Sequence, residues 1–362
     1  MAENKDKKVL NVPHLRFPEF SGEWKRKTIE KIAPLQRGFD LPTQNIVEGI
    51  YPVVYSNGIL RYHDKYKCEA PGLITGRSGT IGKFTYIDSG FYWPHNTSLW
   101  VTDFCGNCPK FIYYLYQIVH IEQFATGSGV PTLNRNDVHR YQTFVPAAII
   151  KQEKIAKFLS LLDERIRLHN KIIEDLKKLK SAISERLFKS VKGSIVLLSD
   201  ICDIVKGKQI NGENLSERGR YYVMNGGTEP SGYYDDYNVE ANTISISEGG
   251  NSCGYVQFNT FPFWSGGHCY SIQNVTGNVD NLYLYHYLKS NEDNIMKLRI
   301  GSGLPNIQKK DLAMFKIIVP TLEQQMTIST FLSSIERKAE IERRIQNAIQ
   351  KQKLYLLQQM FI

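Results

Sequence analysis

Cys105 and Cys108 are the residues whose spacing most suggests chemistry, because a Cys-x-x-Cys pair is typical of a zinc site or a redox dithiol. A structural zinc site needs four ligands, and the sequence holds no second pair of this spacing. The six cysteines are otherwise scattered along the chain, which predicts free thiols in a cytosolic protein. We therefore expect this chain to bind no metal.

Motifs that would place a catalytic group are missing from the sequence. We find no Walker A loop, dinucleotide fingerprint, His-Glu-x-x-His site or nucleophile elbow. The Asn/Asp-Pro-Pro-Phe/Tyr tetrapeptide that adenine methyltransferases use is also missing. Methyl transfer and DNA cleavage both need sites of this kind, so we expect a chain without catalysis and without a cofactor of its own.

Composition favours an anionic partner. The chain has 45 Lys and Arg against 36 Asp and Glu, a formal net charge of +9, and basic groups bind nucleic acids by releasing counterions from phosphates. Many basic proteins bind nothing anionic, so charge alone leaves both possibilities open. The charged N-terminal segment lacks the apolar core of a signal peptide, and no apolar run approaches the roughly 20 residues that span a bilayer. We expect a cytoplasmic protein with no membrane partner.

The elements that must position any functional residue occur twice in the chain, with a shift of about 170 residues. Such a long shift indicates duplicated domains rather than a solenoid. The matching segments are Tyr51-Pro-Val53 with Tyr221-Tyr-Val223, Phe91-Tyr-Trp93 with Pro262-Phe-Trp264, and Gly127-Ser-Gly-Val-Pro131 with Gly301-Ser-Gly-Leu-Pro305.

Each copy ends in a long segment without Gly or Pro, from about residue 152 to 192 and from 324 to 362. A helix of about 35 residues extends some 50 Å, longer than a small domain is wide, so its apolar stripe needs an equally long partner. The other copy supplies one, and the chain order favours an antiparallel pair. Steps of four and three residues mark a coiled-coil seam, interrupted by His169 and Lys180. Its members are Ile155, Leu159, Leu162, Ile166, Ile173, Leu176, Ile183 and Leu187 in the first helix and Ile328, Leu332, Ile335, Ile345, Ile349 and Leu356 in the second.

The order of these features resembles the specificity (S) subunit of bacterial type I restriction-modification systems. In each copy a Gly-Ser-Gly-x-Pro segment is followed by a Val-Pro step and then by a long helix that begins near Lys-Gln-Glu or Gln-Gln. The N-terminal Leu15-Arg-Phe-Pro18, followed by Trp24, is also similar to the arm of that family. The resemblance covers essentially the whole chain.

The resemblance implies an α+β fold, with two similar mixed α/β target recognition domains separated by two long helices that pair as an antiparallel coiled coil. We expect an arm over residues 1–20, domains over 21–150 and 194–321, and helices over 151–193 and 322–362. Each domain would read one half of a split, asymmetric target in double-stranded DNA, and the helices would set the gap.

The resemblance also implies the partners. Two modification (methyltransferase) subunits would carry S-adenosylmethionine, and the restriction subunits would carry ATP and Mg²⁺.

Side chains that match base edges, placed in glycine-bearing loops, are candidate readers of DNA. Arg77 flanks a glycine turn together with Ser78 and Lys83, and its guanidinium matches guanine O6 and N7. Glu248 stands at the equivalent position of the second copy, close to Asn251, and would accept from cytosine N4. Solvated surface loops account for the same residues.

Further candidates lie in the neighbouring loops. Arg37, Lys206 and Lys208 are candidate phosphate ligands or ordinary surface residues. Hydrogen bonds to DNA are available from Asn57, Asn96, Asn225 and His268, although Asn-Gly pairs are most often plain turns.

Two further groups of residues have other expected roles. We expect Trp93 and Trp264 in the domain cores, and the Gly-Ser-Gly-x-Pro segments to be structural. Phe158, Ile172 and Leu179 lie outside the seam and are expected to dock partner helices.

Two rival hypotheses remain. A scaffold protein with only non-specific DNA affinity predicts no preference for any duplex sequence. A stand-alone metal-dependent nuclease predicts DNA cutting by this chain alone. A third possibility, RNA binding, lacks the aromatic pattern of the commonest RNA-reading module.

Overall fold

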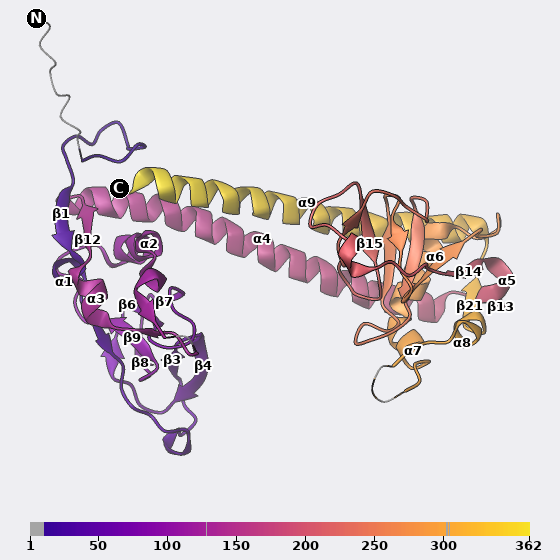
Figure 1. Ribbon diagram of the computed structural model, residues 1–362, viewed down its shortest axis with the longest axis horizontal. Helices are drawn as coiled ribbons and strands as arrows, with labels where there is room; N and C mark the ends of the chain where they lie inside the picture. Colours follow the sequence, from indigo (N-terminus) through magenta and orange to yellow (C-terminus); the bar gives the residue numbers. More distant parts are fainter. Residues whose placement is uncertain (1–10, 128, 302, 304) are drawn as a thin grey trace, which may run out of the picture. The chain divides into compact units, whose positions relative to one another are not determined.

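The computed structural model describes residues 11–127, 129–301, 303 and 305–362 (Figure 1). The chain forms two compact units, of which the first runs to Leu168 and includes Ile345–Ile362, and the second is His169–Arg344. Each unit therefore combines a globular domain with a stretch of both long helices, α4 (Ile149–Ser190) and α9 (Leu322–Met360). The two helices begin and end within three residues of the bounds that the sequence predicts.

Two four-stranded sheets form the body of the first domain. One has the antiparallel order β2-β9-β6-β7, and the other has the order β4-β3-β8-β5, in which β3 and β8 are parallel. The strands are β1 (Lys25–Thr28), β2 (Leu35–Arg37), β3 (Tyr51–Tyr55), β4 (Gly58–His63), β5 (Cys68–Glu69), β6 (Gly72–Gly76), β7 (Phe84–Ile87), β8 (Phe91–Pro94), β9 (Ser98–Val101), β10 (Ala125–Thr126), β11 (Thr132–Leu133) and β12 (Gln142–Val145). The helices before α4 are α1 (Ile29–Ile32), α2 (Pro109–Val119) and α3 (Arg135–Arg140).

The second domain repeats this arrangement, with an antiparallel sheet β14-β20-β17-β18 and a sheet β16-β15-β19 in which β15 and β19 are parallel. Its strands are β13 (Ser194–Leu197), β14 (Asp203–Lys206), β15 (Tyr221–Met224), β16 (Tyr233–Tyr234), β17 (Thr243–Ser247), β18 (Val256–Asn259), β19 (Trp264–Ser265), β20 (Cys269–Gln273) and β21 (Lys316–Val319). Its helices before α9 are α5 (Leu198–Ile201), α6 (Asn281–Ser290), α7 (Glu292–Met296) and α8 (Lys309–Ala313).

The strand register confirms the internal repeat. Val53 lies opposite Trp93 in the parallel pair of the first domain, and Val223 lies opposite Trp264 in the second. Trp93 is buried as expected, whereas Trp264 is only partly buried. Since the same residue types meet at the same register, the duplication extends to the packing of individual side chains.

A buried glutamine fastens each domain to its own long helix. Gln152 donates to the carbonyl oxygen of Pro146 at 2.9 Å and accepts from the backbone N–H of Cys108, at the start of α2, at 2.8 Å. Gln325 bonds Pro320 and the N–H of Asp280, at the start of α6, in the same way. The Val-Pro step and the helix start are therefore held together in both units.

The seam between α4 and α9 is antiparallel. In the first unit Ile155, Leu159 and Leu162 share a core with Ile349 and Leu356. In the second unit the ammonium of Lys180 bonds Glu336, and Nδ1 of His169 lies 2.6 Å from Oε2 of Glu342. The direction matches the prediction, because rising numbers in α4 face falling numbers in α9 (Figure 1).

The predicted seam position of Ile345 needs correction. Its side chain is 37% exposed, and the buried position nearest to it in α9 is Glu342. After a step of three from Leu332 to Ile335, buried positions recur every seven residues along α9, at Glu342, Ile349 and Leu356, so the heptad of alternating three and four continues with no drift. The stripe therefore stays in register because polar residues take some of its positions.

The sequence predicts that Phe158 docks a partner helix, and this prediction also needs correction, because the side chain already packs inside the protein. Its ring lies 5.9 Å from that of Phe17, and both pack against the core of the first unit. The segment around Phe17 also reaches the end of α9, where the N–H of Leu15 donates to the carbonyl oxygen of Gln359 at 2.8 Å. The arm thus covers this face of α4.

Candidate DNA-recognition surface

The candidate residues of the first unit come together where strands of both sheets end. Arg37 is the last residue of β2, Arg77 follows β6, and Lys83 precedes β7. Strands β2 and β6 both pair with β9, so these ends share one edge. Asn57 and Asn96 come from the turns after β3 and β8, whose ends are adjacent in the second sheet.

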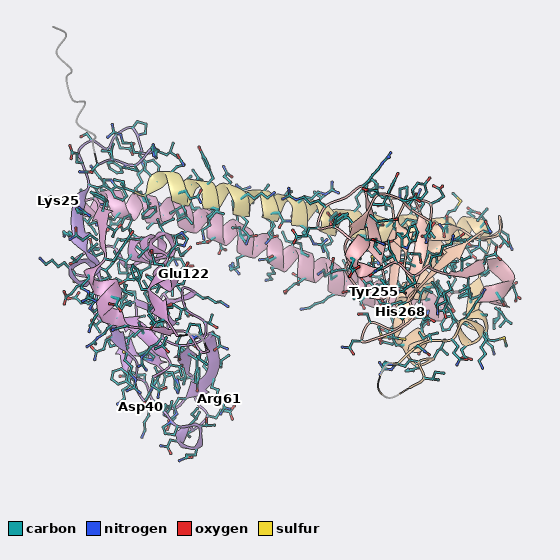
Figure 2. The ribbon with its side chains drawn as sticks, in the orientation of Figure 1. Lys25, Asp40, Arg61, Glu122, Tyr255 and His268 are labelled. Carbon is teal, nitrogen blue, oxygen red and sulfur yellow. The ribbon has the colours of Figure 1, made fainter. Side chains whose placement is uncertain are left out.

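Arg37 is held by a carboxylate rather than free. Its guanidinium donates to Oδ1 of Asp40 at 2.7 Å, and the amide of Asn96 donates to the same oxygen. The loop between Arg37 and Asp40 is anchored by Trp93, whose indole N–H donates to the carbonyl oxygen of Phe39 at 3.3 Å. Figure 2 shows Asp40 on the part of the first domain that lies away from α4.

The loop that carries Arg77 is fixed by its backbone, and among the described residues the Arg77 side chain has no hydrogen-bond or ion-pair partner. The N–H of Arg77 donates to Thr97 at 2.9 Å, and its carbonyl oxygen accepts from Leu133 at 2.7 Å. Gly79 adopts a φ of 76°, in the left-handed region that favours glycine, and its N–H bonds Pro131. The described part of the Gly-Ser-Gly-x-Pro segment therefore braces the loop; Ser128 itself lies outside the described residues.

The second unit assembles its candidates on the equivalent edge. Lys206 ends β14, Asn225 follows β15 and Glu248 follows β17, while His268 precedes β20. Oδ1 of Asn225 accepts from the N–H of His268 at 3.1 Å, which joins the two sheets. Trp264 donates to the carbonyl oxygen of Lys208 at 3.0 Å, as Trp93 does to Phe39.

The sequence predicts that Glu248 accepts a hydrogen bond from cytosine, but in the structure its carboxylate is bonded inside the protein. Its side chain is buried, and Oε1 accepts from Nζ of Lys206 at 2.7 Å and from the hydroxyl of Tyr270 at 3.1 Å. Burial, followed by the charge of Glu248, raises the pKa of Tyr270, so this hydroxyl remains a donor at neutral pH. Glu248 therefore organises the loop, and a direct contact with cytosine is disfavoured.

Sequence comparison places the chain in a family. A model of the type I restriction modification DNA specificity domain matches it twice, over residues 21–178 and 193–351. The chain belongs to this family. Specificity subunits recognise DNA and are not catalytic, so the two domains described above are DNA-recognition domains.

Individual relatives agree with this assignment. A putative type I specificity subunit of Mycoplasma genitalium is 23% identical over 315 residues, which are 81% of this chain and 82% of that protein. Another, from Mycoplasma pneumoniae, is 32% identical over 145 residues, 40% of this chain and 38% of that one.

A solved structure shares the fold. The crystal structure of the type I S subunit from M. genitalium has a TM-score of 0.72 at 20% identity and covers 97% of this chain and 99% of that chain. A chain from a study of complex assembly in a type I R-M system has a TM-score of 0.54 at 16% identity and covers 92% and 95%.

The candidates of this specificity subunit fall into two groups. Arg37, Asn96, Lys206, Asn225 and Glu248 have side-chain partners within the protein. The other candidate side chains have no hydrogen-bond or ion-pair partner in the part of the chain that the structure describes; they are Asn57, Arg77, Ser78, Lys83, Lys208, Asn251 and His268. This second group remains available to a ligand.

The Cys105-x-x-Cys108 pair belongs to the turn before α2. Asn107, between the two cysteines, donates to the carbonyl oxygen of Ile32 at 3.0 Å, and the N–H of Cys108 bonds Gln152. Among residues 11–127, 129–301, 303 and 305–362, no group of three or more His, Cys, Asp or Glu side chains is placed to hold a metal ion. No helix of this described part is long and apolar enough to cross a membrane.

Proposed function

We propose that each domain of this specificity subunit reads one half of a bipartite, asymmetric DNA target through the free side chains on its loop edge. The observation that carries the proposal is that the same edge in both domains gathers free polar side chains. Arg77 stands on one edge where the other has the buried Glu248, so the two edges differ chemically. Equivalent edges with different side chains are suited to different half-sites.

We assign the two groups of candidates different roles. The free residues Arg77 and Asn251 contact bases, and Lys83 and Lys208 contact phosphates. Arg37 and Lys206 are held by carboxylates, which keeps each basic group in one position beside the edge. Contacts of basic side chains with phosphates set the register of the protein on the duplex, and contacts with bases specify the sequence.

A second apolar stripe on the long helices supports the proposed partners. The exposed apolar residues of α4 are Leu161, Leu168, Ile172 and Leu179. On α9 the positions equivalent to Leu168 and Ile172 are Ile341 and Ile345, which are also exposed. We propose that this duplicated stripe docks two modification subunits that carry S-adenosylmethionine. Restriction subunits with ATP and Mg²⁺ then join the complex, in the cytoplasm.

Selection from a random duplex library tests the reading function. The subunit is mixed with its modification subunit at near-physiological salt, and the bound duplexes are sequenced. Two short, different motifs at a fixed gap are expected. Salt-sensitive binding without enrichment would instead support a non-specific scaffold, and metal-dependent cutting by this chain alone would support a nuclease.

Stoichiometry tests the docking. Ile172→Asp and Ile345→Asp each place a charge in one copy of the stripe, so each variant is expected to bind one modification subunit instead of two in native mass spectrometry. Glu153→Asp, an exposed change elsewhere on α4, serves as the control. Two bound subunits in both Asp variants would contradict the proposed surface.

A further inference from the structure

Each unit contains a polar cluster that joins three helices. In the first unit the hydroxyl of Tyr114, on α2, donates to Oδ2 of Asp163, on α4, at 2.6 Å. Nζ of Lys353, on α9, lies 2.5 Å from Oδ1 of the same carboxylate. The ammonium also lies 5.4 Å from the centre of the Tyr114 ring. One carboxylate therefore connects the recognition domain with both long helices.

The second unit holds a similar cluster, in which the acid and the lysine stand at equivalent positions of the helices. Its tyrosine comes from the position before the counterpart of Tyr114, which is His286: this imidazole bonds Ser333 as Tyr114 bonds Ser160. The hydroxyl of Tyr285, on α6, donates to Oε1 of Glu336, on α9, at 2.9 Å. The ammonium of Lys180, on α4, bonds this carboxylate and lies 5.6 Å from the centre of the Tyr285 ring. In each unit the acid belongs to the helix that follows the domain in the chain, and the lysine belongs to the other helix.

The apolar core of each unit also joins the domain to the long helices, and the clusters add hydrogen bonds and ion pairs, which depend more strongly on exact position. Tyr114 and Tyr285 are buried and the lysines are mostly covered, whereas the carboxylates of Asp163 and Glu336 remain 35% and 37% exposed. A domain shifted along the helices by one turn would leave a buried tyrosine hydroxyl without its carboxylate acceptor, which is costly. Polar residues at an otherwise apolar seam specify register in some coiled coils.

We propose that Tyr114–Asp163–Lys353 and Tyr285–Glu336–Lys180 are positioning clusters that fix where each recognition domain sits on its own stretch of the helices, and thereby restrict the gap between the two half-sites. The inference rests on the proposed function, because it assigns a role within bipartite recognition. It concerns the gap alone and predicts no change in the bases that are read.

Library selection with variants of the first cluster tests the proposal. Asp163→Asn and the milder Tyr114→Phe, each assembled with the modification subunit, are expected to keep both half-site motifs. Their preference for one gap length over the neighbouring lengths is expected to fall about tenfold, equivalent to about 1.4 kcal/mol. Asp163→Glu copies the acid of the second cluster and is expected to retain the wild-type gap, and Glu164→Gln, at an exposed neighbour, serves as control.

The outcomes separate the inference from the proposed function. Unchanged gap preference in both Asp163→Asn and Tyr114→Phe, together with lowered thermal stability, would show a merely structural role and overturn the inference. Absence of any bipartite motif in the wild-type selection would instead overturn the proposed function.

Discussion

Replacing Arg77 by Ala should remove the preference for one base pair and leave the fold intact. The backbone of this loop is fixed by bonds to Thr97 and Leu133, which the substitution does not touch. The guanidinium has no ion-pair partner in the described part of the chain, so its removal leaves no buried charge behind. We therefore expect thermal stability to change by no more than about 0.5 kcal/mol, as for other surface substitutions.

The expected loss of recognition is much larger. A bidentate arginine–guanine contact contributes about 1–3 kcal/mol of discrimination against other bases, about 5- to 150-fold in affinity. Because no internal salt bridge competes for Arg77, the whole of this contribution is available to DNA. Selection from the random library should show one position of one half-site turning indifferent to base identity, while every other position keeps its preference.

Lys83→Ala is the matched control, since Lys83 lies on the same edge and also has no side-chain partner among the residues that the structure describes. As a phosphate ligand it should weaken binding to all sequences alike and lower the slope of log K against log salt by about 1. The reasoning about Arg77 would be refuted if its Ala variant behaved like this control, or if the selected motif did not change at all.

Three further predictions concern groups that are buried. Glu248→Ala removes the acceptor of Lys206 and Tyr270 and should lower unfolding stability by about 1–2 kcal/mol without relaxing any base position; relaxed specificity at unchanged stability would contradict this. Gln152→Ala should cost about 1–3 kcal/mol in denaturant unfolding, whereas the exposed Glu153→Ala should not. Burial lowers the pKa of His286 from 6.5 to about 4, so the unfolded state binds its proton first. Stability should therefore be full above pH 6.5 and fall between pH 6.5 and 4, and His286→Gln should flatten this decline.

The sequence contains enough to predict the duplicated architecture. Trp93 and Trp264 are rare residues that stand at the same place in the two copies. They do so because each donates its indole N–H to the loop after the first strand of the antiparallel sheet, β2 or β14. The helices were predictable because forty residues without Gly or Pro have few other stable conformations. The convergence of the candidate loops on one edge was not predictable, because it depends on which strands pair with β9 and β20.

The free or occupied state of each candidate depends on residues far away in the chain. Arg77 and Glu248 look equivalent in sequence, yet within the described part of the chain the side chain of Glu248 is bonded and that of Arg77 is not. The difference arises on the neighbouring strand, where Tyr270 occupies the position of Leu99 and supplies a hydroxyl. A comparison of the two copies residue by residue would have found this substitution, although only the strand pairing shows which loop it faces.

The misplacement of Ile345 has a different origin. A reading of periodicity favours apolar residues, so it placed the seam at Ile345 and treated His169 in α4 as an interruption. In the structure His169 faces Glu342, and Lys338 bonds the other carboxylate oxygen at 2.6 Å. Two polar positions that satisfy each other can occupy a seam, since neither is left without a partner. Ile345 is thereby released to the outer face, at the position equivalent to Ile172. The duplicated exposed stripe and the polar seam are consequently one feature of the helix pair: the sequence places Ile172 on the exposed stripe of α4, and the same position of α9 is found only once Glu342 is accepted as a seam residue.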